Sequence, residues 1–205
     1  MPEMLIIDYG VGNITSVRTA LEALGVRYKV SSSPEDVAAA KAYILPGVGA
    51  FAEAMKNLES RGLVEPLRYE VLENKKPILG ICLGMQVLAE DSTENGAHKG
   101  LGIIQGRVVR IEEREGFSVP HVGWNEVKVF QKDPLFSMLV SGARFYFDHS
   151  YHFETAPEHV AAAAEYGGAI TAAVQHGNIF GVQFHPEKSQ TAGLKLLRAF
   201  TTHAL

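Results

Sequence analysis

The stretch Pro77-Ile78-Leu79-Gly80-Ile81-Cys82-Leu83-Gly84 decides the fold, because a short apolar run leads directly into a cysteine flanked by glycines. Residues 77–81 predict a buried strand, and residues 83–90 predict a helix that begins at once. A strand, a tight turn and a helix in this order form a nucleophile elbow. Gly80 and Gly84 fit such an elbow, because the strand and helix backbones approach each other closely there.

Cys82 is the only cysteine in the chain, which excludes an intramolecular disulfide. An ordinary βα turn with a buried cysteine explains the elbow segment equally well, since free cysteines are often buried. A helix N-terminus stabilises an anion only modestly, so a reactive thiol at this position needs a histidine partner.

The segment Phe184-His185-Pro186-Glu187 supplies the best candidate for that partner. Pro186 biases His185 toward an extended backbone, in which residues i and i+2 project to the same side. Glu187 can then orient the imidazole while its other nitrogen faces the thiol. Alone, the segment is better explained as a surface turn. Together with the elbow, it favours a triad of Cys82, His185 and Glu187.

A glycine loop, Pro46-Gly47-Val48-Gly49-Ala50-Phe51, follows a predicted strand at residues 42–45. The backbone N–H groups of Val48 and Gly49, with that of Leu83, are candidates for an oxyanion hole. A phosphate-binding loop is one alternative, but it requires the Lys and Ser or Thr of GxxxxGK[ST], which are absent here. A purely structural βα loop is the other.

The first ninety residues alternate apolar runs with amphipathic stretches, which predicts βα units around a parallel sheet. Further strands are predicted at residues 4–8 and 28–31, and helices at residues 14–24, from Ser33 onward, and within residues 50–74. The second half is β-rich, with strands predicted at residues 107–111, 127–130 and 145–151, a hairpin turning at Gly177-Asn178, and a closing helix at residues 189–205. We therefore expect one α/β domain spanning residues 1–205.

The composition is that of a globular protein, with 46% hydrophobic and 20% charged residues. A formal charge of -4 argues against nucleic-acid binding, which needs clustered Lys and Arg. The start of the chain has no basic region and only a short apolar run, so neither a signal peptide nor a membrane span is expected, and the cytoplasm is the expected location. No spacing of His and Cys suggests a metal site, and no cofactor is expected.

The Gly-x-Cys-x-Gly and Phe-His-Pro-Glu segments resemble the signatures of the class I, or triad, glutamine amidotransferases. The match continues through the glycine loop and Gly80-Ile81-Cys82-Leu83-Gly84-Met85-Gln86. Ile7-Asp8-Tyr9-Gly10-Val11-Gly12-Asn13 and Pro120-His121-Val122-Gly123-Trp124-Asn125 are similar to the glutaminase subunits of imidazole glycerol phosphate synthases. The resemblance covers essentially the whole chain, and the last two segments select this group within the class.

The resemblance implies a three-layer α/β fold with a mostly parallel central sheet flanked by helices. It also implies hydrolysis of L-glutamine and a heterodimer with a (β/α)₈ barrel cyclase subunit of histidine biosynthesis. The cyclase would use the ammonia to form imidazole glycerol phosphate and aminoimidazole carboxamide ribotide. An amidotransferase of guanylate, anthranilate or pyridoxal phosphate synthesis, and a non-catalytic regulatory subunit of the same fold, are the alternatives.

Carried over by position, the resemblance makes Cys82 the nucleophile, His185 the general base and acid, and Glu187 the residue that orients His185. Glutamine would be held by Gly49, Gln86, Ser150 and Tyr151. Partner-facing positions would be Asn13, Pro120, His121, Trp124 and Lys188. Asn13 also suits a helix N-cap and Trp124 a core position. Asp148 departs from the family pattern, in which an apolar residue is usual.

Overall fold

The computed structural model describes residues 4–205, and its main feature is a sheet of nine strands within that range. The parallel part consists of neighbouring strands that are buried except for the edge strand at residues 28–31, as is typical of strands covered on both faces. In spatial order these are β2 (Tyr28–Ser31), β1 (Met4–Ile7), β3 (Ala42–Gly47), β4 (Ile78–Cys82) and β13 (Ile179–Val182). The nucleophile elbow therefore follows a strand near the middle of the sheet.

The sheet continues beyond β13 with antiparallel strands. In spatial order they are β12 (Ala169–His176), β11 (Val160–Glu165), β8 (His121–Val129) and β9 (Arg144–His149). The predicted hairpin at Gly177-Asn178 joins β12 to β13. The sheet is thus mixed, and the β-rich second half of the chain supplies its antiparallel part. The predicted parallel arrangement of strands holds for the part of the sheet that carries the candidate site.

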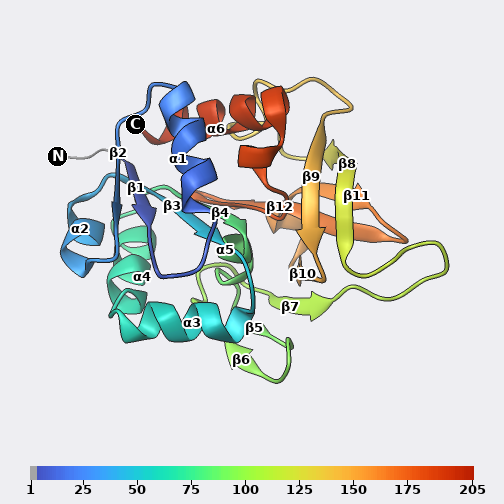
Figure 1. Cartoon of the computed structure of the whole chain (residues 1–205), viewed down its shortest axis with the longest axis horizontal. Helices are drawn as coiled ribbons and strands as arrows, with labels where there is room; N and C mark the ends of the chain where they lie inside the picture. The colour runs from blue at the N-terminus through green and yellow to red at the C-terminus, as the bar shows by residue number, and fades with distance from the viewer. Residues whose placement is uncertain (1–3) are drawn as a thin grey trace.

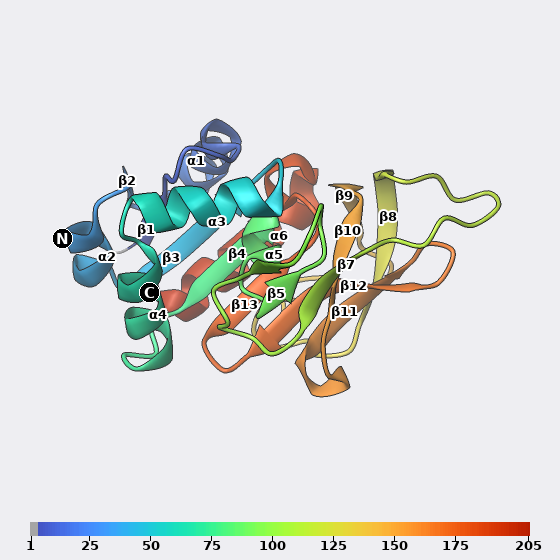
Figure 2. The same cartoon turned by 90° about the horizontal axis from the view of Figure 1, so that it is seen from below.

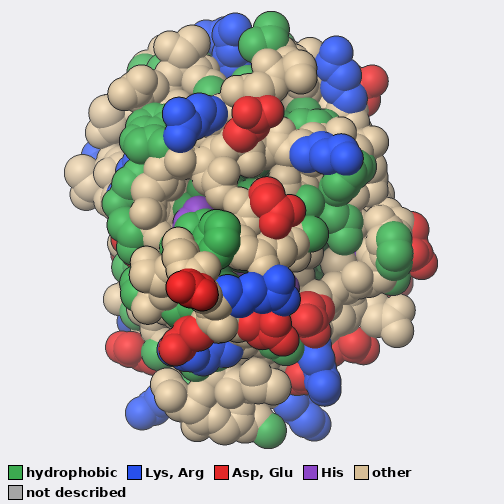
Figure 3. Space-filling view, turned by 90° about the vertical axis from the view of Figure 1, so that its right-hand side faces the viewer, with side chains coloured by type: hydrophobic (Ala, Val, Ile, Leu, Met, Phe, Trp, Pro, Cys, Tyr) green, Lys and Arg blue, Asp and Glu red, His purple; other side chains and the backbone are tan. Residues whose placement is uncertain are grey.

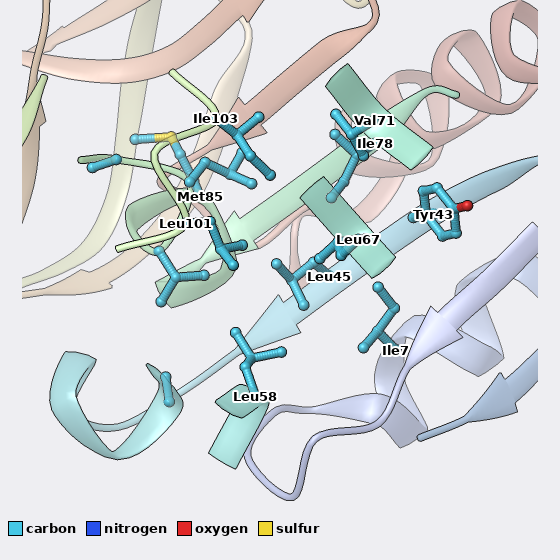
Figure 4. Packing of buried hydrophobic residues seen from close by; sticks show 14 of the residues in the cluster. Ile7, Tyr43, Leu45, Leu58, Leu67, Val71, Ile78, Met85, Leu101 and Ile103 are labelled. Carbon is cyan, nitrogen blue, oxygen red and sulfur yellow. The ribbon is translucent and has the colours of Figure 1, made fainter. Parts of the chain in front are cut away.

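Helices cover both faces of the sheet (Figure 1), as the three-layer expectation requires. One layer contains α1 (Ile14–Ala23) and α6 (Gln190–Ala204), and the other contains α2 (Pro34–Ala39), α3 (Phe51–Ser60) and α4 (Val64–Leu72). Alternate residues of β1 separate the two cores: Met4 and Ile6 pack in the cluster under α1 and α6. Leu5 and Ile7 belong to the cluster under α2, α3 and α4, shown from close by in Figure 4.

A second sheet, of four strands among the described residues, lies against the large sheet, with its β10 next to β12 (Figure 2). Its order is β10 (Tyr151–Glu154), β7 (Arg107–Arg110), β5 (Asp91–Ser92) and β6 (His98–Lys99). The chain passes from β9 in the large sheet to β10 in the small one at Ser150. The single strand predicted at residues 145–151 is therefore two strands, in two sheets. Short 3₁₀ turns, η1 (Pro157–His159) and η2 (Pro186–Lys188), complete the elements.

Helix α5 (Leu83–Gln86) is shorter than the helix predicted to reach Glu90. The carbonyls of Val87, Leu88 and Ala89 do not continue a helix, because they accept hydrogen bonds from backbone N–H groups of residues 101–104. That returning segment ends the helix after one turn, and no local sequence signal announces it. Strand β8 also starts earlier than predicted, because residues 121–126 pair with β9 despite their polar character.

Surface charge agrees with the composition. The end of the molecule seen in Figure 3 carries Lys and Arg side chains interspersed with Asp and Glu and with hydrophobic groups. Within residues 4–205, no helix has the length and apolar character needed to cross a membrane.

Candidate active site

The strand order brings the predicted catalytic segments together. In the parallel part of the sheet, β4 lies between β3 and β13, and the carboxyl ends of these strands meet at one edge. Gly47 is the register partner of Cys82, so the glycine loop starts beside the elbow. Val182 pairs with Ile81, which places His185 just beyond the neighbouring strand end. Segments far apart in the sequence thus converge on one point.

Cys82 occupies the tip of the elbow in a left-handed conformation, with φ of 55° and ψ of -112°. Few non-glycine residues adopt positive φ, and such strain is typical of functional turns. The flanking glycines are required sterically. A Cβ on Gly84 would lie 1.7 Å from the carbonyl oxygen of Leu45, and one on Gly80 would lie 2.5 Å from the carbonyl oxygen of Gly84. The predicted elbow is confirmed.

His185 and Glu187 form the expected pair. His185 Nδ1 lies 2.8 Å from Glu187 Oε1, and both side chains are almost completely buried. Burial alone would lower the pKa of His185, but hydrogen bonds with Cys82 and Glu187 outweigh it and raise that pKa to about 10. The raised pKa favours the imidazolium form of His185, which lies against the sulfur of Cys82 and so can stabilise a thiolate there.

Strand β9 holds the backbone of His185 in place. The N–H of His185 donates to the Tyr146 carbonyl at 2.8 Å. Ser189 Oγ accepts from the Tyr146 N–H at 3.0 Å and donates to the His185 carbonyl at 2.6 Å. His185 is thus attached to the antiparallel part of the sheet as well as to β13.

A cavity of about 250 Å³ opens over Cys82. Its walls contain the predicted oxyanion and glutamine-binding residues together with side chains that the sequence did not single out. The lining residues are Val48, Gly49, Cys82, Leu83, Gln86, Glu94, Asp148, His149, Ser150, Tyr151, His185 and Lys188. Glu187 does not line the cavity and contacts His185 instead, as the orienting role predicted for it requires.

Glu94, Asp148 and His149 line the cavity but were not predicted as site residues, and Asp148 was noted only as a departure from the family pattern. Glu94 supplies a carboxylate to the cavity, and its Oε2 accepts from the Phe51 N–H at 2.7 Å. It follows the very short strand β5, so no motif or periodicity marked it. His149 directly precedes the predicted Ser150-Tyr151 pair but carried no motif of its own.

His149 belongs to a buried pair of histidines whose tautomers are fixed by their partners. Its Nδ1 donates to the Tyr151 carbonyl at 2.8 Å, so its Nε2 accepts from His121 Nδ1 at 3.0 Å. Asn125 Nδ2 lies 3.4 Å from His121 Nε2. Burial lowers the pKa of His121 to about 4 and that of His149 to about 3, so both rings are neutral. Residues 4–205 contain no group of His, Cys, Asp or Glu side chains arranged to hold a metal ion.

The predicted partner-facing positions differ in how far their side chains are exposed. Pro120, Trp124 and Lys188 are exposed, and the Lys188 ammonium lies 5.5 Å from the centre of the Tyr146 ring. Asn13 is half-buried and caps α1, since its Oδ1 accepts from the Ser16 N–H. His121 is the exception: it is buried and stacked on the Tyr166 ring, with centroids 3.9 Å apart. The side chain of His121 is therefore not part of the surface.

The family model of class-I glutamine amidotransferases matches residues 5–204. The chain belongs to this family. It is 47% identical to imidazole glycerol phosphate synthase subunit HisH 1 of Campylobacter jejuni, over 95% of this chain and 97% of the relative. It is 46% identical to subunit HisH of the same synthase in Methanosarcina acetivorans, over 98% of each chain.

Solved structures share the fold at lower sequence identity. A glutamine amidotransferase crystal structure superposes with a TM-score of 0.77 at 22% identity, covering 98% of both chains. A second glutamine amidotransferase, from Thermotoga maritima, gives a TM-score of 0.68 at 18% identity, covering 99% of this chain and 97% of that chain. These similarities establish the class I amidotransferase fold.

Proposed function

We propose that the chain is the glutaminase subunit of an imidazole glycerol phosphate synthase, which hydrolyses glutamine to glutamate and ammonia for a cyclase partner. The observation that carries the proposal is the contact between the sulfur of Cys82, at a strained elbow, and a His185 that Glu187 orients. Relatives of nearly equal length at 46–47% identity bear the name of this synthase. The sequence identity to these relatives favours this synthase over the amidotransferases of guanylate, anthranilate and pyridoxal phosphate synthesis.

In the first half-reaction the Cys82 thiolate attacks the side-chain amide carbon of glutamine. The Leu83 N–H and a donor from the glycine loop stabilise the negative charge on the amide oxygen. The His185 imidazolium gives its proton to the departing nitrogen. Ammonia leaves, and a γ-glutamyl thioester remains on Cys82.

In the second half-reaction His185 is neutral and accepts a proton from water as the water attacks the thioester carbon. The carbon–sulfur bond breaks, glutamate leaves, and the thiolate–imidazolium pair is restored. Glu187 keeps the ring orientation through both steps and stabilises the imidazolium when it forms.

The cavity suits an amino acid in size and chemistry. At about 250 Å³ it is smaller than sites for drug-sized ligands. The Glu94 carboxylate suits the α-ammonium group of glutamine. Gln86 is held with its amide nitrogen on the Tyr151 carbonyl, so its Oε1 is the atom that can accept from the substrate amide. Gly49, Ser150 and Tyr151 would border the rest of the substrate.

The partner is a (β/α)₈ barrel cyclase that binds the surface around Trp124, Pro120 and Lys188. Trp124 is 41% exposed and the adjacent Val122 is 54% exposed, which is unusual for large apolar side chains on a strand. Lys188 lines the cavity as well, so a partner that contacts Lys188 reaches the active site directly. The expected location is the cytoplasm, because an enzyme of histidine biosynthesis works on soluble metabolites.

The test is synthesis by the heterodimer with either nitrogen source. Cys82→Ala is expected to abolish glutamine-dependent synthesis and to leave synthesis from ammonium salts intact, because the mutation affects only the first half-reaction. An equal loss of both activities would contradict the division of labour. Retention of glutamine-dependent synthesis would contradict the role of Cys82.

A further inference from the structure

Gln183 is a fully buried polar side chain that the mechanism above does not use. It lies between the end of β13 and His185, with 0% of its surface exposed. Its amide nitrogen Nε2 lies 3.7 Å from Cys82 Sγ, within hydrogen-bonding range of a sulfur acceptor. Buried polar groups are nearly always hydrogen-bonded, so the sulfur is one of the partners that satisfy this amide.

Two further contacts fix which end of the Gln183 amide faces the sulfur. The backbone carbonyl of Tyr151 can only accept, so the Gln86 atom 2.9 Å from it is the amide nitrogen. The same nitrogen donates its second hydrogen to Gln183 Oε1 at 3.0 Å. The oxygen of Gln183 is thereby held on Gln86, and its N–H group is left facing Cys82.

The Tyr151 carbonyl is itself a fixed point, because it also accepts from His149 Nδ1 at 2.8 Å. A backbone oxygen with two donors has little freedom to rotate away from either. The orientation of the Gln183 amide is therefore set by the main chain at the junction of β9 and β10.

We propose that Gln183 stabilises the thiolate form of Cys82 by donating an N–H hydrogen bond to Sγ, and that Gln86 positions Gln183 for this task. An anionic acceptor forms a stronger hydrogen bond than a neutral one, so the bond strengthens when the thiol ionises. The inference rests on the proposed function in taking Cys82 as the nucleophile. It adds a neutral donor to the charge that His185 provides.

The bond acts at two points of the reaction. A thioester sulfur is neutral and a weak acceptor, so the bond weakens when Cys82 attacks glutamine and strengthens again when the thiolate leaves. Gln183 therefore favours formation of the attacking anion and its departure in the second half-reaction. The first effect is present without substrate, so any electrophile can report it.

The experiment is alkylation of the full chain by iodoacetamide across a range of pH, with the ultraviolet absorbance of the thiolate as a second readout. Cys82 is the only cysteine, so both signals belong to it. Gln183→Met keeps the length of the side chain and removes the donor. The variant is expected to move both curves to higher pH by about one unit, the size of effect typical of a hydrogen bond to a charged group. Unchanged curves would overturn the proposal.

Gln86→Met is the second variant, because it leaves Gln183 in place but releases its oxygen. The expected shift has the same direction and is smaller, and an unchanged alkylation curve here would overturn the positioning role. If Gln183→Met does not fold, Gln183→Leu takes its place, since it is also neutral, lacks the donor and differs from Met in shape. The same shift supports the proposal, and no shift overturns it.

Gln175→Met is the matched control, because the Gln175 amide donates to the Asp133 carbonyl and not to a group in the cavity. It is expected to lower stability without moving the alkylation curve. A shift in this control equal to that of Gln183→Met would overturn the proposal. Failure of the wild-type chain and cyclase to release glutamate would contradict the proposed function, and the alkylation curves would still decide the role of Gln183.

Discussion

His121 Nδ1 donates to His149 Nε2 over 3.0 Å, so two neutral imidazole rings are hydrogen-bonded inside the protein beside the active site. His121 comes from β8 and His149 from β9, which are register neighbours at these residues. The pair therefore links the surface strand that carries Trp124 to the wall of the cavity. Its neutrality makes this link sensitive to acid.

Stability is expected to fall as the pH is lowered from about 6.5 toward 4. The pKa values of His121 and His149 are lowered to about 4 and about 3, so in this window the unfolded chain binds protons that the folded chain does not. Each histidine then costs about 1.4 kcal/mol per pH unit well below 6.5. His185, whose pKa is raised, is protonated in the folded state throughout this window and in both states in its lower part, so it does not contribute to the loss of stability toward acid. Denaturant unfolding at several pH values measures the slope.

The double variant His121→Asn, His149→Asn supplies the control for that slope. It is expected to be less stable at neutral pH and to show a flatter decline toward acid. His152, whose pKa burial also lowers, remains in both proteins and cancels in the comparison. An identical decline in the two proteins would show that other groups govern acid unfolding.

Glu187→Gln is expected to be milder than His185→Ala. An amide at residue 187 can still accept from His185 Nδ1–H and keep the ring in place, whereas Ala removes the proton carrier. Glutamate release by each heterodimer, compared through kcat, measures the difference. Equal losses would leave orientation unsupported as the role of Glu187.

Glu94→Gln is expected to raise KM for glutamine roughly tenfold or more, with a smaller effect on kcat. The substitution keeps an acceptor for the Phe51 N–H but removes the negative charge proposed to meet the α-ammonium group. Glu59→Gln, at an exposed position on α3, is the control and should leave KM unchanged. A fall in kcat with KM unaltered would mean that Glu94 does not contribute to the binding of glutamine in the ground state.

Tyr9→Phe is expected to leave the free energy of unfolding unchanged or to raise it by about 1 kcal/mol. The Tyr9 hydroxyl is buried and, among the described residues, has no hydrogen-bond partner, so removing it relieves an unsatisfied group. Tyr43→Phe is the matched control, because the equally buried Tyr43 hydroxyl donates to the Val37 carbonyl at 2.7 Å. Tyr43→Phe should lose about 1 kcal/mol. Equal losses in both variants would mean that Tyr9 has a partner in solution.

The isolated chain is expected to be a slow glutaminase that the cyclase activates, most strongly when the cyclase holds its nucleotide. Gly49 has φ of 99°, and a Cβ there would meet nothing within 4 Å, so a peptide of this loop can reorient at small steric cost. One oxyanion donor changes a rate by roughly a hundred- to a thousandfold. The test compares the rate of glutamate release by the chain alone, by the chain with apo cyclase and by the chain with nucleotide-loaded cyclase. Equal rates in the three mixtures would exclude activation.

Gly49→Ala tests whether the loop is the element that responds. A side chain at this positive φ is strained, so the variant should alter the ratio of activated to basal rate. Gly47 is unsuited to the purpose, since a Cβ there would lie 2.5 Å from the Tyr9 hydroxyl and disturb the packing. If the ratio of activated to basal rate is unaltered in Gly49→Ala, a segment other than the glycine loop responds to the cyclase.

The elbow and the triad were predicted from two sequence segments taken together, and strands β1 to β4 from local apolar runs, whereas the parallel pairing of β13 with β4 was not predicted. Gly80 and Gly84 marked the close backbone approach, and Pro186 marked the extended segment of His185. What escaped prediction depends on contacts between distant segments. Residues 101–104 end α5 by pairing with the carbonyls of residues 87–89, the chain changes sheets at Ser150, and Glu94 enters the cavity from a turn after a strand too short to show periodicity.

Gly84 approaches Leu45 so closely that a Cβ on Gly84 would lie 1.7 Å from the Leu45 carbonyl oxygen. As a result, the two sides of the active site differ in rigidity. The backbones of β3, β4 and the elbow cannot slide past one another, so the Cys82 sulfur is held in a fixed position. The glycine loop lines the opposite side of the cavity. Its Val48 side chain is 41% exposed, so this part of the cavity wall is less tightly packed. We therefore expect a partner that gates this enzyme to shift the oxyanion donor of the glycine loop, while Cys82 and the Leu83 N–H stay where the strands hold them.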